Sequence, residues 1–260
     1  MCCGRFGLWG RDHTFPQEIC VLEKQHVNPQ TTNIFITQRA KSSMITASPK
    51  SILKRTILLC IALGVMALGV ALSIKADLGT SPISSVPYVV SLISAMSVGT
   101  ATILVNAILL VGEILIMRRQ FQPIQLLQLA VVTLFGWLID LCLWGLDDLT
   151  YADYGQQWLI CIAGIIILGI GVSLEVTANL IPLPGEGLIL SICTVLPIKF
   201  GNMKVITDVS LVVAAVLLSF IFLADLYGVR EGTIAAAICV GLVSKMVIRL
   251  IGPYQRWLTS

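Results

Sequence analysis

Six long runs of apolar residues constrain this chain more than any other feature of its sequence. A helix needs about 20 apolar residues to cross the hydrocarbon of a bilayer, and each run is close to that length. The runs cover residues 56–74, 98–117, 124–146, 157–176, 204–224 and 232–251. With 57% hydrophobic and 12% charged residues, the chain has little left for a soluble domain. The sequence therefore predicts an all-α fold, a polytopic membrane bundle of six long spans.

Two further apolar segments, Pro82–Ser97 and Pro184–Leu196, are too short to cross comfortably. Each begins with a proline, which suits the first turn of a helix. Pro87 is expected to kink the first short helix, and Pro197 is expected to end the second. Because "VPYVVSLISAM" and "LILSICTVL" carry no charge, we expect re-entrant or buried short helices. The alternative is a pair of amphipathic helices lying flat at the interface.

The chain aligns with itself when it is shifted by 102 residues. "GVALSIKADLGTSP" (69–82) then falls on "GVSLEVTANLIPLP" (171–184). The same shift makes three further pairs, which are Asp77 with Asn179, Gly99 with Gly201, and Asn106 with Asp208. Each half would hold a long span, a short helix and two more long spans. We expect two membrane repeats, at 51–150 and 151–256.

Residues 1–50 differ from the rest of the chain. They have mixed charge, no sustained period and no apolar core of a signal peptide. We expect a polar, disordered N-terminal tail. Met44 is an alternative start, just ahead of the first span.

The basic residues distinguish six crossings from eight. If the short helices re-enter, only Lys75 and Arg230 lie on one side of the membrane. The other side then holds Lys50, Lys54, Arg55, Arg118, Arg119, Lys199, Lys204, Lys245, Arg249 and Arg256. If the short helices cross, Arg118 and Arg119 move outside. Because cytoplasmic loops carry an excess of Lys and Arg, we expect six spans, both termini in the cytoplasm and two inverted halves.

Polar and ionisable residues inside the spans are candidates for a binding site, because they are costly in a bilayer. Asn106 and Asp208 occupy equivalent places and would face each other near a pseudo-twofold axis, unless Asp208 is interfacial. Glu113 lies on the helix face of Asn106, or it pairs with Arg118 at the interface. Asp140 lines a cavity or lies at the interface.

The interrupted segments supply further candidates, which are Asp77, Asn179, Glu186, Thr80, Ser81, Ser84 and Ser85. Asp77 is expected to cap the first short helix or to pair with Lys75. Glu186 falls in the first turn of the second short helix, where the helix dipole stabilises a carboxylate. It is either a helix-start residue or a cation or proton site. The hydroxyls and free N–H groups at the first short helix can hold an anion.

Several function classes have no support in the sequence. The only histidines, His13 and His26, lie in the tail, and the eight cysteines show no CxxC or Cys/His spacing. No basic patch with interleaved aromatic residues indicates nucleic-acid binding. We expect no enzyme activity, no cofactor and no metal. The expected partners are the lipid bilayer and an unknown small solute or ion, and a homodimer is left open.

Three stretches carry a family resemblance: "ADLGTSPISSVPYVVS", "PLPGEGL" and "VREGTIAAAICVGL". At these residues the chain resembles bacterial membrane proteins of the YczE/YyaS/YitT type, over about residues 56–251. The resemblance implies a protein of the bacterial cytoplasmic membrane whose biochemical role is largely unassigned. It implies no catalytic or binding residues.

Two functions fit these observations. Interrupted segments at matching places in inverted halves are typical of a transporter's central site, which predicts a small-solute or ion secondary transporter or exporter. The second function is a membrane scaffold or regulatory subunit without transport. Water-accessible polar residues in the spans would favour the first, whereas a dry interior of paired side chains would favour the second.

Overall fold

The computed structural model describes residues 49–118, 123–196, 198 and 200–259. Every regular element in this part of the chain is a helix. In order they are α3 (Pro49–Lys75), α4 (Pro82–Ser94), α5 (Val98–Met117), the 3-10 helix η2 (Pro123–Leu126), α6 (Leu127–Gly145), α7 (Tyr154–Ala178), α8 (Pro184–Val195), α9 (Phe200–Leu223) and α10 (Glu231–Thr259). The predictions for the tail, for Met44 and for Pro197 concern positions outside the described residues.

Six of these helices are long and apolar enough to cross a membrane, which are α3, α5, α6, α7, α9 and α10. This confirms the predicted all-α bundle of six candidate spans. The helices α4 and α8 have 13 and 12 residues, so they measure about 20 and 18 Å at 1.5 Å per residue. Both are shorter than the roughly 30 Å of hydrocarbon that a spanning helix must cross.

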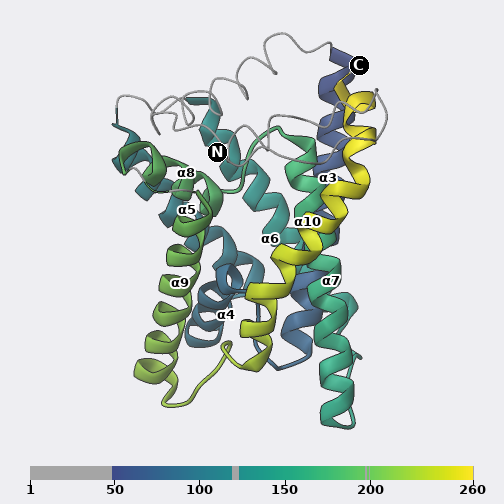
Figure 1. Cartoon of the computed structure of the whole chain (residues 1–260). Coiled ribbons are helices and arrows are strands. Elements are labelled where there is room, and N and C mark those ends of the chain that lie inside the picture. Colours follow the sequence, from purple (N-terminus) through teal and green to yellow (C-terminus); the bar gives the residue numbers. More distant parts are fainter. Residues whose placement is uncertain (1–48, 119–122, 197, 199, 260) are drawn as a thin grey trace, which may run out of the picture.

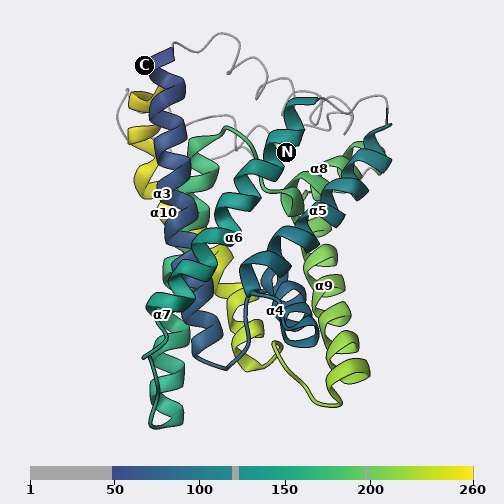
Figure 2. The same ribbon diagram turned by 180° about the vertical axis from the view of Figure 1, so that it is seen from behind.

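The long helices cross the molecule alternately. In Figure 1, α3 runs from the upper to the lower end, α5 returns and α6 descends, and Figure 2 shows the same course from behind. Next, α7 ascends, α9 descends and α10 ascends. The short helix α4 lies in the lower half and α8 lies near the upper end. The helices α3, α5 and α6 therefore run in directions opposite to those of α7, α9 and α10, taken in order.

The most extensive helix contact joins the antiparallel pair α3 and α7, which pack along much of their length. A Cβ atom on Gly69 would lie 2.6 Å from the backbone nitrogen of Leu168. A Cβ atom on Gly171 would lie 2.7 Å from the backbone nitrogen of Met66. Glycine at these two positions lets the helix backbones touch, as is common in membrane bundles.

Among the described helices, only α6 and α10 pack extensively on this pair. α6 packs on α3 and α5, and α10 packs on α7. Both short helices pack between α5 and α9, each of which contacts α4 and α8. The short helices therefore fill the space between two spans.

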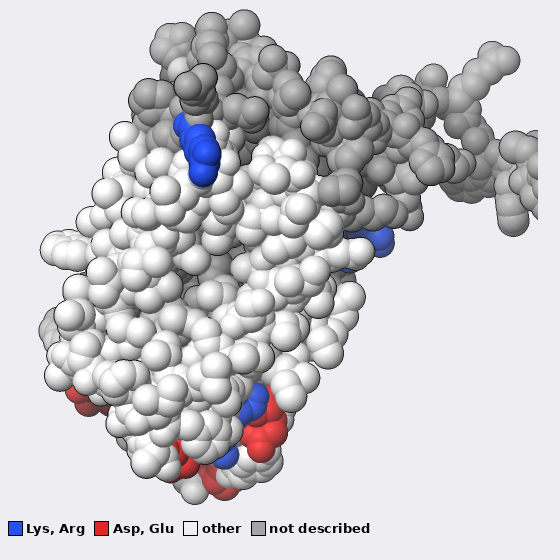
Figure 3. Space-filling model, turned by 90° about the vertical axis from the view of Figure 1, so that its left-hand side faces the viewer, with Lys and Arg blue, Asp and Glu red and all other residues white. Residues whose placement is uncertain are grey.

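The outer surface has an apolar belt with charge at its ends. Trp137, Trp144 and Ile221 are examples of large apolar side chains that are more than two-thirds exposed, as expected for surfaces that face lipid. Figure 3 shows a broad uncharged zone, with acidic side chains gathered at the lower end.

Two cations lie at this acidic end. Lys75 pairs with Asp147 at 3.1 Å, and Arg230 lies 3.8 Å from the Asp77 carboxylate. The start of α3 and the ends of α5 and α10, which carry most other described cations, reach the upper end. This is the distribution that six spans predict. The side chains of Lys50, Arg119, Lys199 and Arg256 are outside those described.

Candidate functional site

The stretch between α3 and α4 turns back into the protein. Asp77 and Gly79 have φ angles of 54° and 94°, which end α3 and redirect the chain. The backbone nitrogen of Thr80 donates to the Gly228 carbonyl at 3.2 Å, and that of Gly232 donates to the Leu78 carbonyl at 2.8 Å. The connection between α9 and α10 thus satisfies backbone groups of this irregular stretch, as non-helical backbone inside a bundle requires.

The predicted role of Asp77 is wrong in both its forms. Ser81, at the N-cap of α4, makes no side-chain cap bond, and Lys75 pairs with Asp147 instead. The Arg230 guanidinium donates to the Asp77 carbonyl at 2.8 Å and lies near its carboxylate. The left-handed turn at Asp77 explains the error, because it places this residue beside the start of α10 rather than at the start of α4.

The hydroxyls at the start of α4 bond to one another and to nearby carbonyls. Ser81 Oγ donates to Ser84 Oγ at 3.0 Å, and Ser85 Oγ donates to the Pro82 carbonyl at 2.7 Å. Thr80 Oγ1 donates to the Ser81 carbonyl at 3.4 Å. These bonds stabilise a helix start that is largely buried. An anion site at this helix start stays a prediction.

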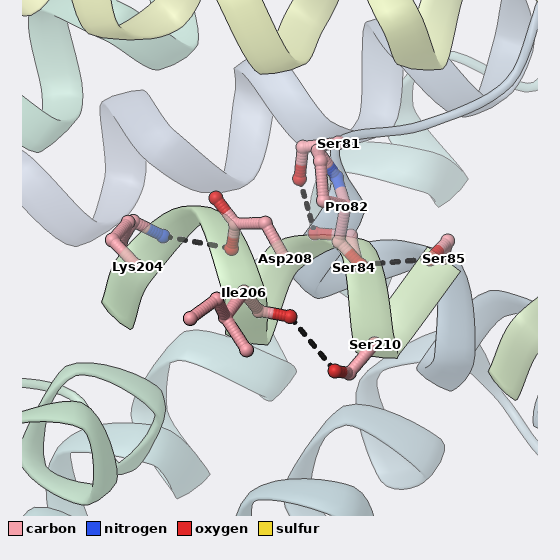
Figure 4. A network of polar contacts seen from close by, with 8 residues as sticks. All are labelled: Ser81, Pro82, Ser84, Ser85, Lys204, Ile206, Asp208 and Ser210. Carbon is pink, nitrogen blue, oxygen red and sulfur yellow. Dashed lines mark hydrogen bonds and ion pairs between the residues drawn. The ribbon is translucent and has the colours of Figure 1, made fainter. Parts of the chain in front are cut away.

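A charged cluster lies where α7, α8 and α9 come together, and we define it as Glu175, Glu186, Lys204 and Asp208. Lys204 and Asp208 form an ion pair at 3.0 Å, one turn apart on α9. Glu186 is within electrostatic range of both, and Glu175 is within range of Glu186 and Lys204. Figure 4 shows the start of α4 beside the Lys204–Asp208 pair, in agreement with the packing of α4 on α9.

Sequence reasoning missed Glu175 as a member of this cluster. Its side chain is 6% exposed, and its Oε1 accepts a bond from the backbone nitrogen of Leu183 at 3.3 Å. Glu175 lies one turn before Asn179, where the long apolar run ends, and this position was the available signal. Asn179 itself ends α7 in the left-handed conformation, with φ 46°. Among the described residues, no group of three or more acidic, His or Cys side chains is placed to hold a metal ion.

Asn106 and Asp208 form bonds on their own helices. Asn106 Nδ2 donates to the Thr102 carbonyl at 2.9 Å, whereas Asp208 pairs with Lys204. No hydrogen bond in the described part of the chain joins the two side chains, and α4 and α8 pack between their helices. Asn106 is buried, as expected for a residue facing the interior.

Glu113 lies in a second polar cluster, which we define as Glu113, Gln125, Gln128 and Ser191. Gln125 Nε2 donates to Glu113 Oε1 at 3.0 Å, and the Gln128 and Ser191 side chains lie close to the carboxyl group. Glu113 is 1% exposed, and Arg118 is exposed at the end of α5. The alternative of a surface pair with Arg118 is therefore wrong. Gln125 and Gln128, two polar residues near the start of an apolar run, were the missed signal.

Asp140 has a structural role. Its carboxylate accepts bonds from Ser97 Oγ and the backbone nitrogen of Gly99, both at 2.7 Å. These groups are at the start of α5, where a negative charge also complements the helix dipole. Asp140 therefore joins α6 to α5 by capping it, which neither predicted alternative described.

Comparison with known proteins finds a family match over the same region of the chain. Residues 53–249 match a family described as "Family of unknown function (DUF6198)". The chain belongs to this family. The matched residues include all of α4–α9 and most of α3 and α10, so both clusters lie within them.

A curated relative supports the YyaS part of the resemblance. The chain is 30% identical over 129 residues to "Uncharacterized protein YyaS" of Bacillus subtilis (strain 168). This alignment covers 49% of the chain and 63% of the relative, so the chain spans less than two thirds of that relative's length. No solved structure matches the chain.

Proposed function

We propose that this chain is a secondary transporter or exporter of a small solute or ion in the bacterial cytoplasmic membrane. Its central site would lie where α4 and α8 begin, between two inverted halves with both chain termini in the cytoplasm. The halves would rock about this site to expose it to either side in turn. The proposal assigns the chain no covalent chemistry.

The packing of the helices supports two inverted halves. When two similar units are related by a twofold axis, each contact between them occurs twice with the partners exchanged. α4 packs on α9 and α8 packs on α5, and within the halves α3 packs on α6 and α7 on α10. The helix directions in Figure 1 are reversed between the halves.

Individual residues repeat the same relation at the 102-residue shift. Gly69 touches Leu168, and Gly171 touches Met66, which are the same contact with the halves exchanged. The helix-ending residues Asp77 and Asn179 are both left-handed. The residues preceding the two short helices, at positions 81 and 183, both have φ −63° and ψ 151°.

The observation that carries the proposal is the contact between the two short helices at their starts. A Cβ atom on Gly185 would overlap Cδ1 of Ile83, and these two positions are themselves related by the shift. A residue that meets its own equivalent lies at the symmetry axis. Two short helices therefore begin at the pseudo-twofold axis of a membrane bundle, the arrangement that transporters use for substrate.

Charged side chains stand next to this axis. Glu186 follows Gly185 directly, and the Lys204–Asp208 pair lies beside the start of α4 (Figure 4). Ionisable groups in an apolar bundle are costly and commonly mark a solute or ion path.

Accessibility from the two sides of the membrane tests this function. Ser84 and Glu186 are equivalent under the shift and lie at the two short-helix starts. Ser84→Cys and Glu186→Cys would each be made in a cysteine-free chain and treated with a membrane-impermeant thiol reagent from either side. Tyr154→Cys, at an exposed helix start, is the positive control, and Ala62→Cys, at 0% exposure in α3, is the silent control.

We expect the cysteines at positions 84 and 186 to be labelled from both sides of the membrane. Blocking access from one side should change the rate of labelling from the other side. Silence at both positions, with Tyr154→Cys labelled, would overturn the transport proposal and favour the scaffold. Labelling from one fixed side only would rule out alternating access.

A further inference from the structure

The Glu113 cluster contains two hydrogen-bond acceptors that the protein leaves without a donor. Glu113 Oε2 and Gln128 Oε1 are both shielded from solvent and have no hydrogen-bond partner. Both side chains are 1% exposed. The Ser191 hydroxyl, which also lies close to the carboxyl group, donates to the Gly187 carbonyl at 2.9 Å. Each of these two oxygens needs a donor, and the Gln128 amide lies close to the Glu113 carboxyl group.

Among the described residues of the helices packed around Glu113, no cation supplies that donor. α4 and η2 carry no charged residue, and α5 carries none besides Glu113. On α6 the only charge is Asp140, which binds Gly99 at the other end of α5, about 21 Å away along that helix at 1.5 Å per residue. On α8 the only charge is Glu186, which faces Lys204 and Asp208. Glu113 Oε1 accepts a bond from Gln125, but a buried carboxylate without a cation beside it is still strongly unfavourable.

The carboxyl group packs tightly against α8. A single Cβ atom on Gly187 would lie 2.6 Å from Glu113 Oε2 and 3.1 Å from Gln128 Nε2. The Glu113 carboxyl group and the Gln128 amide therefore both lie against the α8 backbone at Gly187. A proton is the occupant that fits without a cavity.

We infer that Glu113 is a proton-binding site, in which the acid form donates from Oε2 to Oε1 of Gln128. The proton adds to one carboxylate oxygen, and its loss to water restores the carboxylate. Rotation of the Gln128 amide exchanges its oxygen for its NH₂ group, so the same side chain donates to the carboxylate after release. Met117 ends α5 four residues later, about 6 Å along the helix, so the path to the surface is short.

The site lies on the contact between α5 and α8, which gives the proton a role in the proposed function. Gly187 and Ser191 belong to α8, and the start of α8 meets α4 at the axis. A charged Glu113 side chain would be more stable beside water or a new hydrogen-bond donor. Its movement toward either would weaken the packing of α8 on α5. On this basis, which rests on the proposed function, the proton is the coupling ion.

Infrared difference spectroscopy of the purified full chain in lipid tests the inference without knowledge of the solute. A pH titration should show a C=O stretching band of a protonated carboxyl group that is lost as the pH rises. Glu113→Gln should remove this band. Glu231→Gln, at an exposed acid of α10, should leave the band unchanged.

Gly187→Ala provides a second variant that keeps every titratable group. Its methyl group would push the carboxyl and amide apart, so the band should shift or its titration midpoint should move. Gly64→Ala is the matched control, because nothing lies within 4 Å of a Cβ atom at that position. Identical band titrations in wild type and Glu113→Gln would overturn the inference.

The outcomes separate this inference from the proposed function. A titrating Glu113 without two-sided labelling at Ser84 and Glu186 would keep the proton site and reject transport. Two-sided labelling whose rates are unaffected by Glu113→Gln, together with no Glu113 band, would keep transport and reject the proton as coupling ion.

Discussion

At the scale of single residues, Gly69 and Gly171 determine how closely the two central helices approach. Each faces backbone atoms of the opposite helix, together with side-chain atoms of Leu168 or Met66. Gly69→Ala and Gly171→Ala should each destabilise the protein by about 1–3 kcal/mol, the range for overpacked cores. The midpoint of thermal unfolding in detergent should fall for both variants.

Gly64→Ala is the control for this prediction, since its methyl group would enter open space on the same helix. Alanine is favoured over glycine in a helix interior, so its unfolding midpoint should stay or rise. A fall as large as that of Gly69→Ala would show that the contact with Leu168 is not the cause.

Residue roles were predictable only where they depend on neighbours in sequence. Glu186 was expected in the first turn of a short helix and lies there. Asp77 was assigned to Lys75 or the start of α4, but its partner is Arg230, which is more than 150 residues away. A pairing of that kind depends on how the halves pack, and local charge patterns hold no information about it.

At the scale of helices, the contribution of the Asp140 cap on α5 to the free energy of unfolding can be measured. Asp140→Ala removes both charge-assisted bonds and leaves the Gly99 nitrogen without its partner. The expected loss is about 2–4 kcal/mol, taking two such bonds at reduced value for partial exposure. Chemical unfolding in detergent, followed by helix content, measures this loss.

Asp147→Ala is the matched control, because Asp147 is 83% exposed although it pairs with Lys75. Exposed ion pairs contribute about 0–1 kcal/mol. Equal losses for Asp140→Ala and Asp147→Ala would contradict the capping role.

Helix positions followed from apolar length and proline, which are local signals. The span at Val98–Met117 and the proline starts of α4 and α8 were predicted at the positions observed. The packing of α4 and α8 between α5 and α9 was not predicted. Which span covers a short helix depends on contacts that an apolar sequence leaves nearly equal in energy.

At the scale of the whole molecule, the inverted arrangement is the central claim. It requires the short helices to re-enter rather than cross, so that the end of α5 and the start of α3 lie on the same side of the membrane. The structure places Lys75 and Arg230 at the end that carries most acids. Positive charge at the other end would retain that end in the cytoplasm.

Sidedness in whole cells tests this claim most directly. Single cysteines at Lys54, Arg118, Tyr154 and Lys245, in a cysteine-free chain, would be treated with an impermeant thiol reagent before and after permeabilisation. We predict that Tyr154→Cys is labelled in intact cells and that the other three are labelled only after permeabilisation. Arg118→Cys labelled in intact cells, with Tyr154→Cys silent, would mean eight crossings and parallel halves, and would contradict the account.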